Sequence, residues 1–161
     1  DVTRDLGESS SLAVLDGDDV VYMVRSSARH RLMAITLSVG TRLPAAYTSM
    51  GRVLLAQMSD VELEAFLQRT PLRAFTPNSV TDAHRLRQSI LDARQQHYAI
   101  VDQELDSGLR SVAVPLFSGQ GELLGAINVS TNSTRVDLAT LKDRYLPRLQ
   151  EAANNIHDLT R

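Results

Sequence analysis

The feature that most constrains the fold is a β-hairpin predicted on either side of Ser118-Gly119-Gln120-Gly121. With the turn centred in this segment, Ser111 faces Asn128 and Leu109 faces Ser130. Side chains alternate between the two faces of a strand. One face of the hairpin is therefore bulky, with Val112, Val114, Ile127 and Val129. The other is small and polar in its middle, with Ser111, Ala113, Ala126, Asn128 and Ser130.

The two faces predict different environments. The bulky, β-branched face is typical of a packed core. Short side chains beneath covering helices would leave space unfilled, and buried hydroxyl and amide groups there need hydrogen-bond partners. A small polar ligand would supply both, but the same pattern also fits the solvent-exposed face of an antiparallel sheet.

A helix start forms the second notable segment. Residues 40–44 read as an extended entry with a proline-fixed turn, and a helix over 48–57 follows. Thr48 or Ser49 can cap this helix by accepting one of its unpaired N–H groups. Those N–H groups and the helix dipole also favour a carboxylate. A capped start can equally do no more than begin a helix.

The remaining pattern gives an α+β fold. Strands are predicted at 11–16, 20–24 and 32–37, helices at 59–68 and 82–97, and three strands between about 99 and 131. An amphipathic helix begins near Leu138, and Pro147 should kink it or split off its first turns. Strands at both ends with helices between them predict one domain, residues 1–161, with a largely antiparallel sheet.

Composition restricts the partners. The chain has a net charge of −2 and lacks the cluster of Lys and Arg that DNA binding needs. The chain has no cysteine, no apolar run long enough to span a membrane and no leader pattern. These features predict a soluble, cytoplasmic protein that does not itself bind DNA or a membrane.

Little in the sequence indicates catalysis. The four histidines, His30, His84, His97 and His157, are scattered without metal-ligand spacing. No nucleophile elbow, phosphate loop or dinucleotide motif occurs. Asp102, Glu104 and Asp106 alternate, so a strand would place them on one face, where a metal or an acid pair is conceivable. We expect no enzyme activity, no metal and no cofactor.

The segments GTRLPAAYTSMGRVLLA and VDQELDSGLRSVAVP, in that order, resemble the effector-binding domain of the IclR family of bacterial transcription factors. The resemblance covers nearly all of the chain. Both segments look most similar to the branch that regulates aromatic-acid breakdown through the β-ketoadipate pathway. It implies a GAF-like domain, a central sheet with helices on both sides. It also implies a winged helix-turn-helix DNA-binding domain N-terminal to the segment given by residues 1–161.

The resemblance also implies a set of effector-binding residues. Polar positions of the family pocket match Ser111, Asn128 and Ser130, and the helix start matches Thr48, Ser49 and Met50. Apolar walls match Leu32 and Ile35. An acidic position matches Asp102, although an alignment slipped by one residue puts Val101 there.

Three arginines are left without an assigned role. The guanidinium groups of Arg31, Arg42 and Arg110 suit two-point contact with a carboxylate, but arginines also commonly serve structural roles.

We therefore expect a ligand sensor that binds a small organic acid, aromatic or keto, and transmits binding to DNA through the missing N-terminal domain. Homo-oligomers, dimers or tetramers, are what the family implies. The alternatives are an enzyme that acts on a small carboxylic acid in the same pocket, or a pure dimerisation module. The sequence does not specify the effector, the target genes, or activation versus repression.

Overall fold

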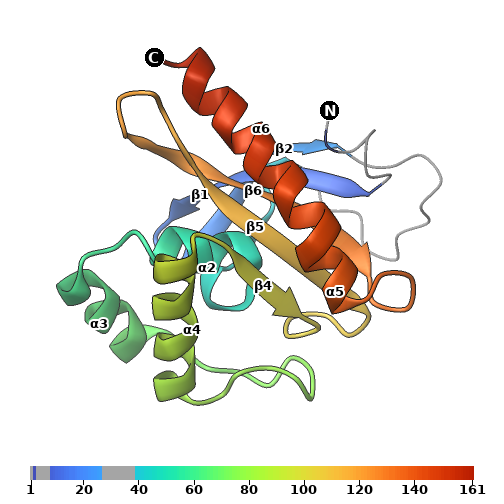
Figure 1. The fold of residues 1–161 in the computed structure, drawn as a ribbon. Helices are drawn as coiled ribbons and strands as arrows, with labels where there is room; N and C mark the ends of the chain where they lie inside the picture. The colour runs from blue at the N-terminus through green and yellow to red at the C-terminus, as the bar shows by residue number, and fades with distance from the viewer. Residues whose placement is uncertain (1, 3–7, 27–38) are drawn as a thin grey trace.

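The computed structural model describes Val2 and residues 8–26 and 39–161 of the chain. Six strands form one antiparallel sheet in the order β3-β2-β1-β6-β5-β4 (Figure 1). The strands are β1 (Ser9–Asp16), β2 (Asp19–Ser26), β3 (Arg42–Pro44), β4 (Ala99–Asp102), β5 (Leu109–Phe117) and β6 (Leu123–Asn132). The helices are η1 (Ala45–Tyr47), α2 (Ser49–Leu55), α3 (Asp60–Arg69), α4 (Ala83–Gln96), α5 (Leu138–Thr140), η2 (Leu141–Tyr145) and α6 (Leu146–Leu159).

Helices lie on both sides of this sheet. In Figure 1, α6 crosses over β5 and β6, while α2 packs on the opposite face with α3 and α4 beyond it. The predicted α+β class with a largely antiparallel sheet is thus confirmed. The strand predicted at 32–37 lies outside the described residues.

The two faces of the sheet carry separate cores. On the α6 side, Val112, Val114 and Val129 are buried against Leu141 and Leu149. On the α2 side, small residues of the strands face the bulky side chains of the helices. The strand residues of that second core include Ala13, Ala99, Ala113 and Ala126, and the helical ones include Met50, Leu54, Phe66, Leu86 and Ile90. The bulky hairpin face is therefore a packed core, as its sequence predicts.

The hairpin register differs from the predicted one by two residues. Ser111 pairs with Ser130 and Ala113 with Asn128. The turn extends to Glu122, whose carbonyl accepts the Ser118 N–H, and an irregularity at Leu116/Phe117 shifts the pairing further. Because side chains alternate with a period of two, a two-residue shift leaves each one on its predicted face.

Helix α2 lies very close to the segment that precedes it. A Cβ atom on Gly51 would stand 2.0 Å from the carbonyl oxygen of Ala45, so only glycine fits at this position. The approach lets η1 and α2 fold back tightly above the small face of the sheet.

The C-terminal helix changes character at its predicted break. Pro147 lies in the first turn of α6, directly after the π-helical turn η2. Proline has no N–H group and its ring crowds the preceding turn, and the wider π turn accommodates it. The helix thus continues across Pro147.

A buried carboxylate joins the start of β1 to the α6 side of the sheet. Glu8 is 1% exposed, and its Oε2 atom accepts hydrogen bonds from Tyr145 Oη at 2.8 Å and Thr131 Oγ1 at 3.1 Å. Arg135 also donates to this atom and forms an ion pair with it. Burial, and next the hydrogen bond to Glu8, raises the pKa of Tyr145 to about 12 from an ordinary 10.0.

This shift predicts an alkaline limit on stability. Because the folded-state pKa lies above the unfolded one, the contribution of Tyr145 is complete below pH 10 and is lost as the pH rises towards 12. The full loss in the free energy of unfolding, reached above pH 12, amounts to ~2–3 kcal/mol, and about half of it is present at pH 11. Urea unfolding at pH 8 and pH 11 should show a smaller alkaline loss in Tyr145→Phe than in the wild type. Equal losses in the two proteins would contradict this coupling.

Candidate functional site

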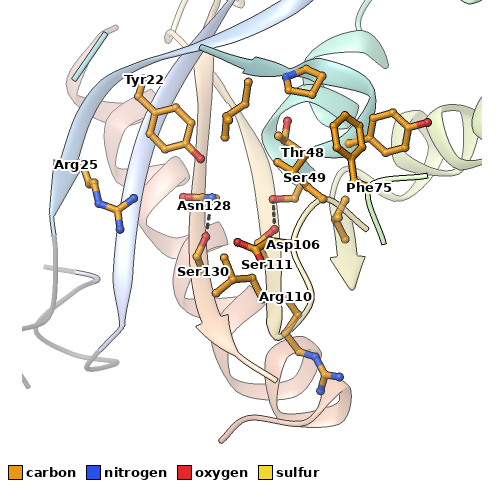
Figure 2. Close-up of a pocket in the computed structure, with 16 residues that line it drawn as sticks. Tyr22, Arg25, Thr48, Ser49, Phe75, Asp106, Arg110, Ser111, Asn128 and Ser130 are labelled. Atoms are coloured by element: carbon orange, nitrogen blue, oxygen red, sulfur yellow. Dashed lines mark hydrogen bonds between the residues drawn. The ribbon is translucent and has the colours of Figure 1, made fainter. Parts of the chain in front are cut away.

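A cavity of about 320 Å³ lies between the small-residue face of the sheet and the segment from β3 to α2. Figure 2 shows the labelled lining residues, with Tyr22 and Arg25 of β2 on one side of Asn128 and Thr48, Ser49 and Phe75 on the other. The full lining is Tyr22, Arg25, Leu43, Pro44, Tyr47, Thr48, Ser49, Phe75, Val101, Leu105, Asp106, Leu109, Arg110, Ser111, Asn128 and Ser130.

Short side chains on neighbouring strands make room for this cavity. Asn128 of β6 lies between Ala113 of β5 and Ser11 of β1 in the sheet, and Ser130 lies between Ser111 and Ser9. Paired residues of antiparallel strands point to the same face, so these positions form a low floor beneath the helices. The sequence-based expectation of unfilled volume above this face agrees with the cavity.

Two hydrogen bonds connect the polar groups of the floor. Ser111 Oγ donates to Ser49 Oγ at 2.8 Å, which links β5 to the start of α2. Asn128 Nδ2 donates to Ser130 Oγ at 3.3 Å. The other terminal atom of this amide, Oδ1, is buried and has no hydrogen-bond partner within the described part of the chain.

The helix start is capped as predicted. Thr48 has an extended backbone, and its Oγ1 accepts the Gly51 N–H at 2.9 Å. Ser49 is the first residue of α2 and is therefore left to face the cavity rather than to cap the helix. Thr48 therefore caps the helix, and both Thr48 and Ser49 line the cavity.

Three charged residues also line the cavity. Arg25 reaches it from β2, and Asp106 and Arg110 reach it from the segment around the start of β5. Arg110 is already engaged, because its Nε donates to Asp102 Oδ1 at 2.9 Å and its Nη1 donates to the Val136 carbonyl at 2.8 Å. Burial raises the pKa of Tyr22, while nearby Arg25 lowers it. The Tyr22 phenol therefore stays protonated at neutral pH and can donate a hydrogen bond.

Aromatic residues form one wall. The rings of Tyr47 and Phe75 meet edge to face, with 5.1 Å between their centroids. Tyr47 Oη donates to the Val80 carbonyl at 2.6 Å and accepts the Arg73 N–H at 2.9 Å. A buried hydroxyl group thus fixes the loop that carries Phe75.

A buried ion pair holds the segments above the cavity together. Arg52 of α2 is 2% exposed, and its Nη2 and Nη1 lie 2.7 and 2.9 Å from the two carboxylate oxygens of Glu104. Its Nε also donates to the Ala46 carbonyl at 2.9 Å, and Nη1 to Ser89 Oγ at 3.2 Å. Arg52 therefore joins η1, α2, α4 and the β4–β5 loop.

The structure brings together five of the predicted site residues, which all line the cavity: Thr48, Ser49, Ser111, Asn128 and Ser130. Leu32 and Ile35, together with Arg31, lie outside the described residues.

Two predicted residues lie elsewhere. Met50 is 0% exposed in the α2-side core, because consecutive helical residues point in directions about 100° apart and Ser49 takes the cavity side. Asp102 is not among the lining residues and pairs with Arg110, whereas its strand neighbour Val101 lines the cavity. Arg42 also lies outside the lining, in exposed ion pairs with Asp16 and Asp19.

The acidic run does not share one face, contrary to the alternation in the sequence. β4 ends at Asp102, and Gln103 has a positive φ of 58°, so the following residues form a turn. Asp102 pairs with Arg110, Glu104 pairs with Arg52, and Asp106 borders the cavity. Among the described residues, no three His, Asp or Glu side chains are grouped so that they would hold a metal ion.

Sequence reasoning missed several lining residues. Tyr22 carried a usable signal, since alternation in the β2 segment places Val20 and Tyr22 on one buried face. Arg25 falls beyond an irregularity in the β1–β2 pairing, which changes the alternation. Phe75 lies in a loop without periodicity, so no sequence pattern indicated it.

Comparison with known proteins identifies the fold family. Residues 1–158 match the family model described as the C-terminal region of the bacterial transcriptional regulator IclR. The chain belongs to the IclR family. In the described part of this IclR domain, no helix is both long and apolar enough to cross a membrane.

Two bacterial regulators are among the proteins similar to the IclR domain. A Pca regulon regulatory protein of Pseudomonas putida is 44% identical, over 96% of this chain and 53% of that protein. A p-hydroxybenzoate hydroxylase transcriptional activator of Acinetobacter baylyi is 33% identical, over 92% of this chain and 56% of that protein. The IclR domain thus spans about half the length of these relatives.

A solved structure adds a ligand-bound neighbour. The inducer-binding domain of the PobR transcription factor from Acinetobacter, a double mutant in complex with 3-hydroxybenzoic acid, superposes on the IclR domain with a TM-score of 0.90. The two are 29% identical, and the match covers 98% of this chain and 92% of that one.

The Arg52–Glu104 pair should control the stability of the IclR domain. Arg52→Leu leaves a largely buried carboxylate without its cation and should lower the free energy of unfolding by ~3–5 kcal/mol. Adding Glu104→Leu should recover part of that loss, which urea titration can measure. Arg69→Leu, which removes an exposed pair with Asp18, is the control and should change little. No recovery in the double variant would contradict this account.

Proposed function

We propose that this chain is a sensor domain that binds a small organic acid, aromatic or keto, without transforming it. The observation that carries the proposal is the cavity above the sheet, whose floor combines short polar side chains with one unpartnered buried amide atom. Binding sites for small molecules are mostly apolar, with a few well-placed polar groups. The lining of this cavity has that character.

The size and walls of the cavity favour a compact ligand with an apolar body. Its volume of about 320 Å³ stands at the lower end of the usual range for ligand pockets. Tyr47, Phe75 and Leu105 offer apolar surface, and a planar ring packs well against aromatic edges and faces. The hydroxybenzoate complex of the Acinetobacter neighbour supports an aromatic acid for this chain too.

Two groups of β2 suit the carboxylate of such a ligand. Arg25 brings a positive charge to the cavity, and the protonated Tyr22 phenol offers a hydrogen-bond donor. Thr48, Ser49, Ser111, Asn128 and Ser130 provide further polar contacts, and Leu32 and Ile35 remain proposed apolar contacts from outside the described residues.

Membership of the family supports the following proposal for the full protein. The domain that binds DNA lies N-terminal to this chain, in a cytoplasmic regulator that assembles as a dimer or tetramer. Ligand binding changes DNA binding only if the effector has different affinities for two states of that assembly. The matches to regulators of the Pca regulon and of p-hydroxybenzoate hydroxylase support aromatic catabolism as the regulated process.

Binding of acids to the purified chain tests the proposal directly. Calorimetry and thermal unfolding with 4-hydroxybenzoate, protocatechuate and β-ketoadipate should reveal at least one saturable ligand, recovered chemically unchanged. Ligand at 100 times its Kd should stabilise the fold by about 2.7 kcal/mol. Consumption of the acid would indicate an enzyme instead. No binding heat and no rise in Tm across a broad panel of acids would favour a dimerisation module.

A substitution in the floor should abolish that stabilisation. Asn128→Leu fills part of the cavity with an apolar side chain, so the ligand-induced rise in Tm should disappear while the protein remains folded. Asn154→Leu makes the same change on an exposed position of α6, beyond the opposite face of the sheet, and should retain the full rise. An unchanged rise in Asn128→Leu would remove Asn128 from the site.

The charge of Arg25 should matter for anionic ligands. Arg25→Met should weaken binding of the best acid by about ten-fold, equivalent to 1.4 kcal/mol. Arg42→Met removes an arginine from the adjacent strand that does not line the cavity, and its affinity should stay within about two-fold of the wild type. Equal effects of the two variants would assign the carboxylate to another partner.

A further inference from the structure

The terminal amide of Asn128 has two chemically different ends. Its Nδ2 group donates and its Oδ1 atom only accepts. Nδ2 donates to Ser130 Oγ at 3.3 Å, on the same strand. Oδ1 is the end without a partner among the described residues, in a side chain that is 3% exposed. Asn128 lines the cavity, so a buried acceptor without a donor lies at the cavity floor.

Neighbouring donors in the cavity do not satisfy this atom. The Ser111 hydroxyl donates to Ser49, and Thr48 Oγ1 is used in the cap of α2. The Tyr22 hydroxyl points towards Asn128 in Figure 2 but makes no hydrogen bond to Oδ1. A ligand in the cavity is thus the natural source of the missing donor.

The chemistry of Oδ1 limits which part of a ligand can meet it. A carboxylate has only acceptor oxygens, and so does a ketone, so either would face Oδ1 with like partial charge. A hydroxyl group on a ring has an O–H that Oδ1 can accept. Burying an acceptor without a partner is costly, and sites built to bind a hydroxyl therefore discriminate strongly against analogues that lack it.

We propose that Asn128 Oδ1 accepts a hydrogen bond from a ring hydroxyl of the effector, so that the domain selects hydroxylated aromatic acids over unsubstituted or keto acids. This inference rests on the proposed function, the sensing of a small organic acid in the same cavity. It assigns to Asn128 the recognition of the substituent and leaves the carboxylate to other groups.

Matched ligand pairs test the inference in the wild-type chain. Fluorine is close to hydroxyl in size but cannot donate, so 3-hydroxybenzoate is compared with 3-fluorobenzoate, and 4-hydroxybenzoate with 4-fluorobenzoate, by calorimetry. In at least one pair the hydroxylated acid should bind about ten-fold tighter or more. This comparison needs no variant, so it stands even if a variant fails to fold.

The variant Asn128→Ala then locates the selectivity. It removes the acceptor without filling the cavity, and thermal unfolding without ligand checks that it folds. The hydroxyl-to-fluoro ratio should fall to within about three-fold, through weaker binding of the hydroxylated acid, while the fluorinated acid binds nearly as before. Asn154→Ala should leave the ratio unchanged.

The outcomes separate this inference from the function on which it rests. Equal binding of hydroxylated and fluorinated acids to the wild type would overturn the role of Asn128 but leave acid sensing intact. An equal loss for both acids in Asn128→Ala would also overturn it, because Asn128 would then contact the shared carboxylate or ring. If no benzoate or keto acid binds the wild type, the proposed function itself fails.

Discussion

The buried bidentate contact between Arg52 and Glu104 is the constraint on which the arrangement of the cavity depends. A guanidinium group removed from water needs nearly all of its donors satisfied. Here the partners come from η1, α4 and the β4–β5 loop, which are far apart in sequence. The hydrogen bonds of Arg52 therefore fix all three segments above the sheet. The space beneath them stays open because these segments cannot collapse independently onto the floor.

The sheet complements this constraint by having unlike faces. The β-branched face is filled by α6, whereas alanine, serine and asparagine on the other face leave a gap that α2 only partly occupies. Close packing normally removes such voids. Gly51 fixes α2 close to the segment before it, because a Cβ atom there would stand 2.0 Å from the carbonyl oxygen of Ala45. The segments joined by Arg52 and the short side chains of the sheet together give a preformed site.

Local patterns made much of this predictable, and long-range contacts set the limit. The cap at Thr48 and the two unlike faces of the hairpin depend on residues close in sequence. The hairpin register was wrong by two because the turn extends to Glu122 and the irregularity at Leu116/Phe117 adds to the shift, and neither has a clear sequence signal. Glu8 meets Thr131 and Tyr145 across separations of 123 and 137 residues, which periodicity cannot reveal. Met50 and Asp102 show the same limit, since a family motif places a segment but not the direction of each side chain.

The aromatic wall differs from the floor in how it is anchored. Phe75 belongs to an irregular loop that is fastened at its ends by the Tyr47 hydroxyl and by Thr76 and Ser79, which bond to the backbone of Gln103 and Glu104. The Phe75 ring takes no part in these hydrogen bonds, although it contacts the Tyr47 ring and the Arg73 guanidinium group. Substitutions of Phe75 can therefore alter the shape of the cavity with little loss of stability of the fold. The ligand specificity of the domain can therefore diverge quickly in evolution through this position, while other residues maintain the fold.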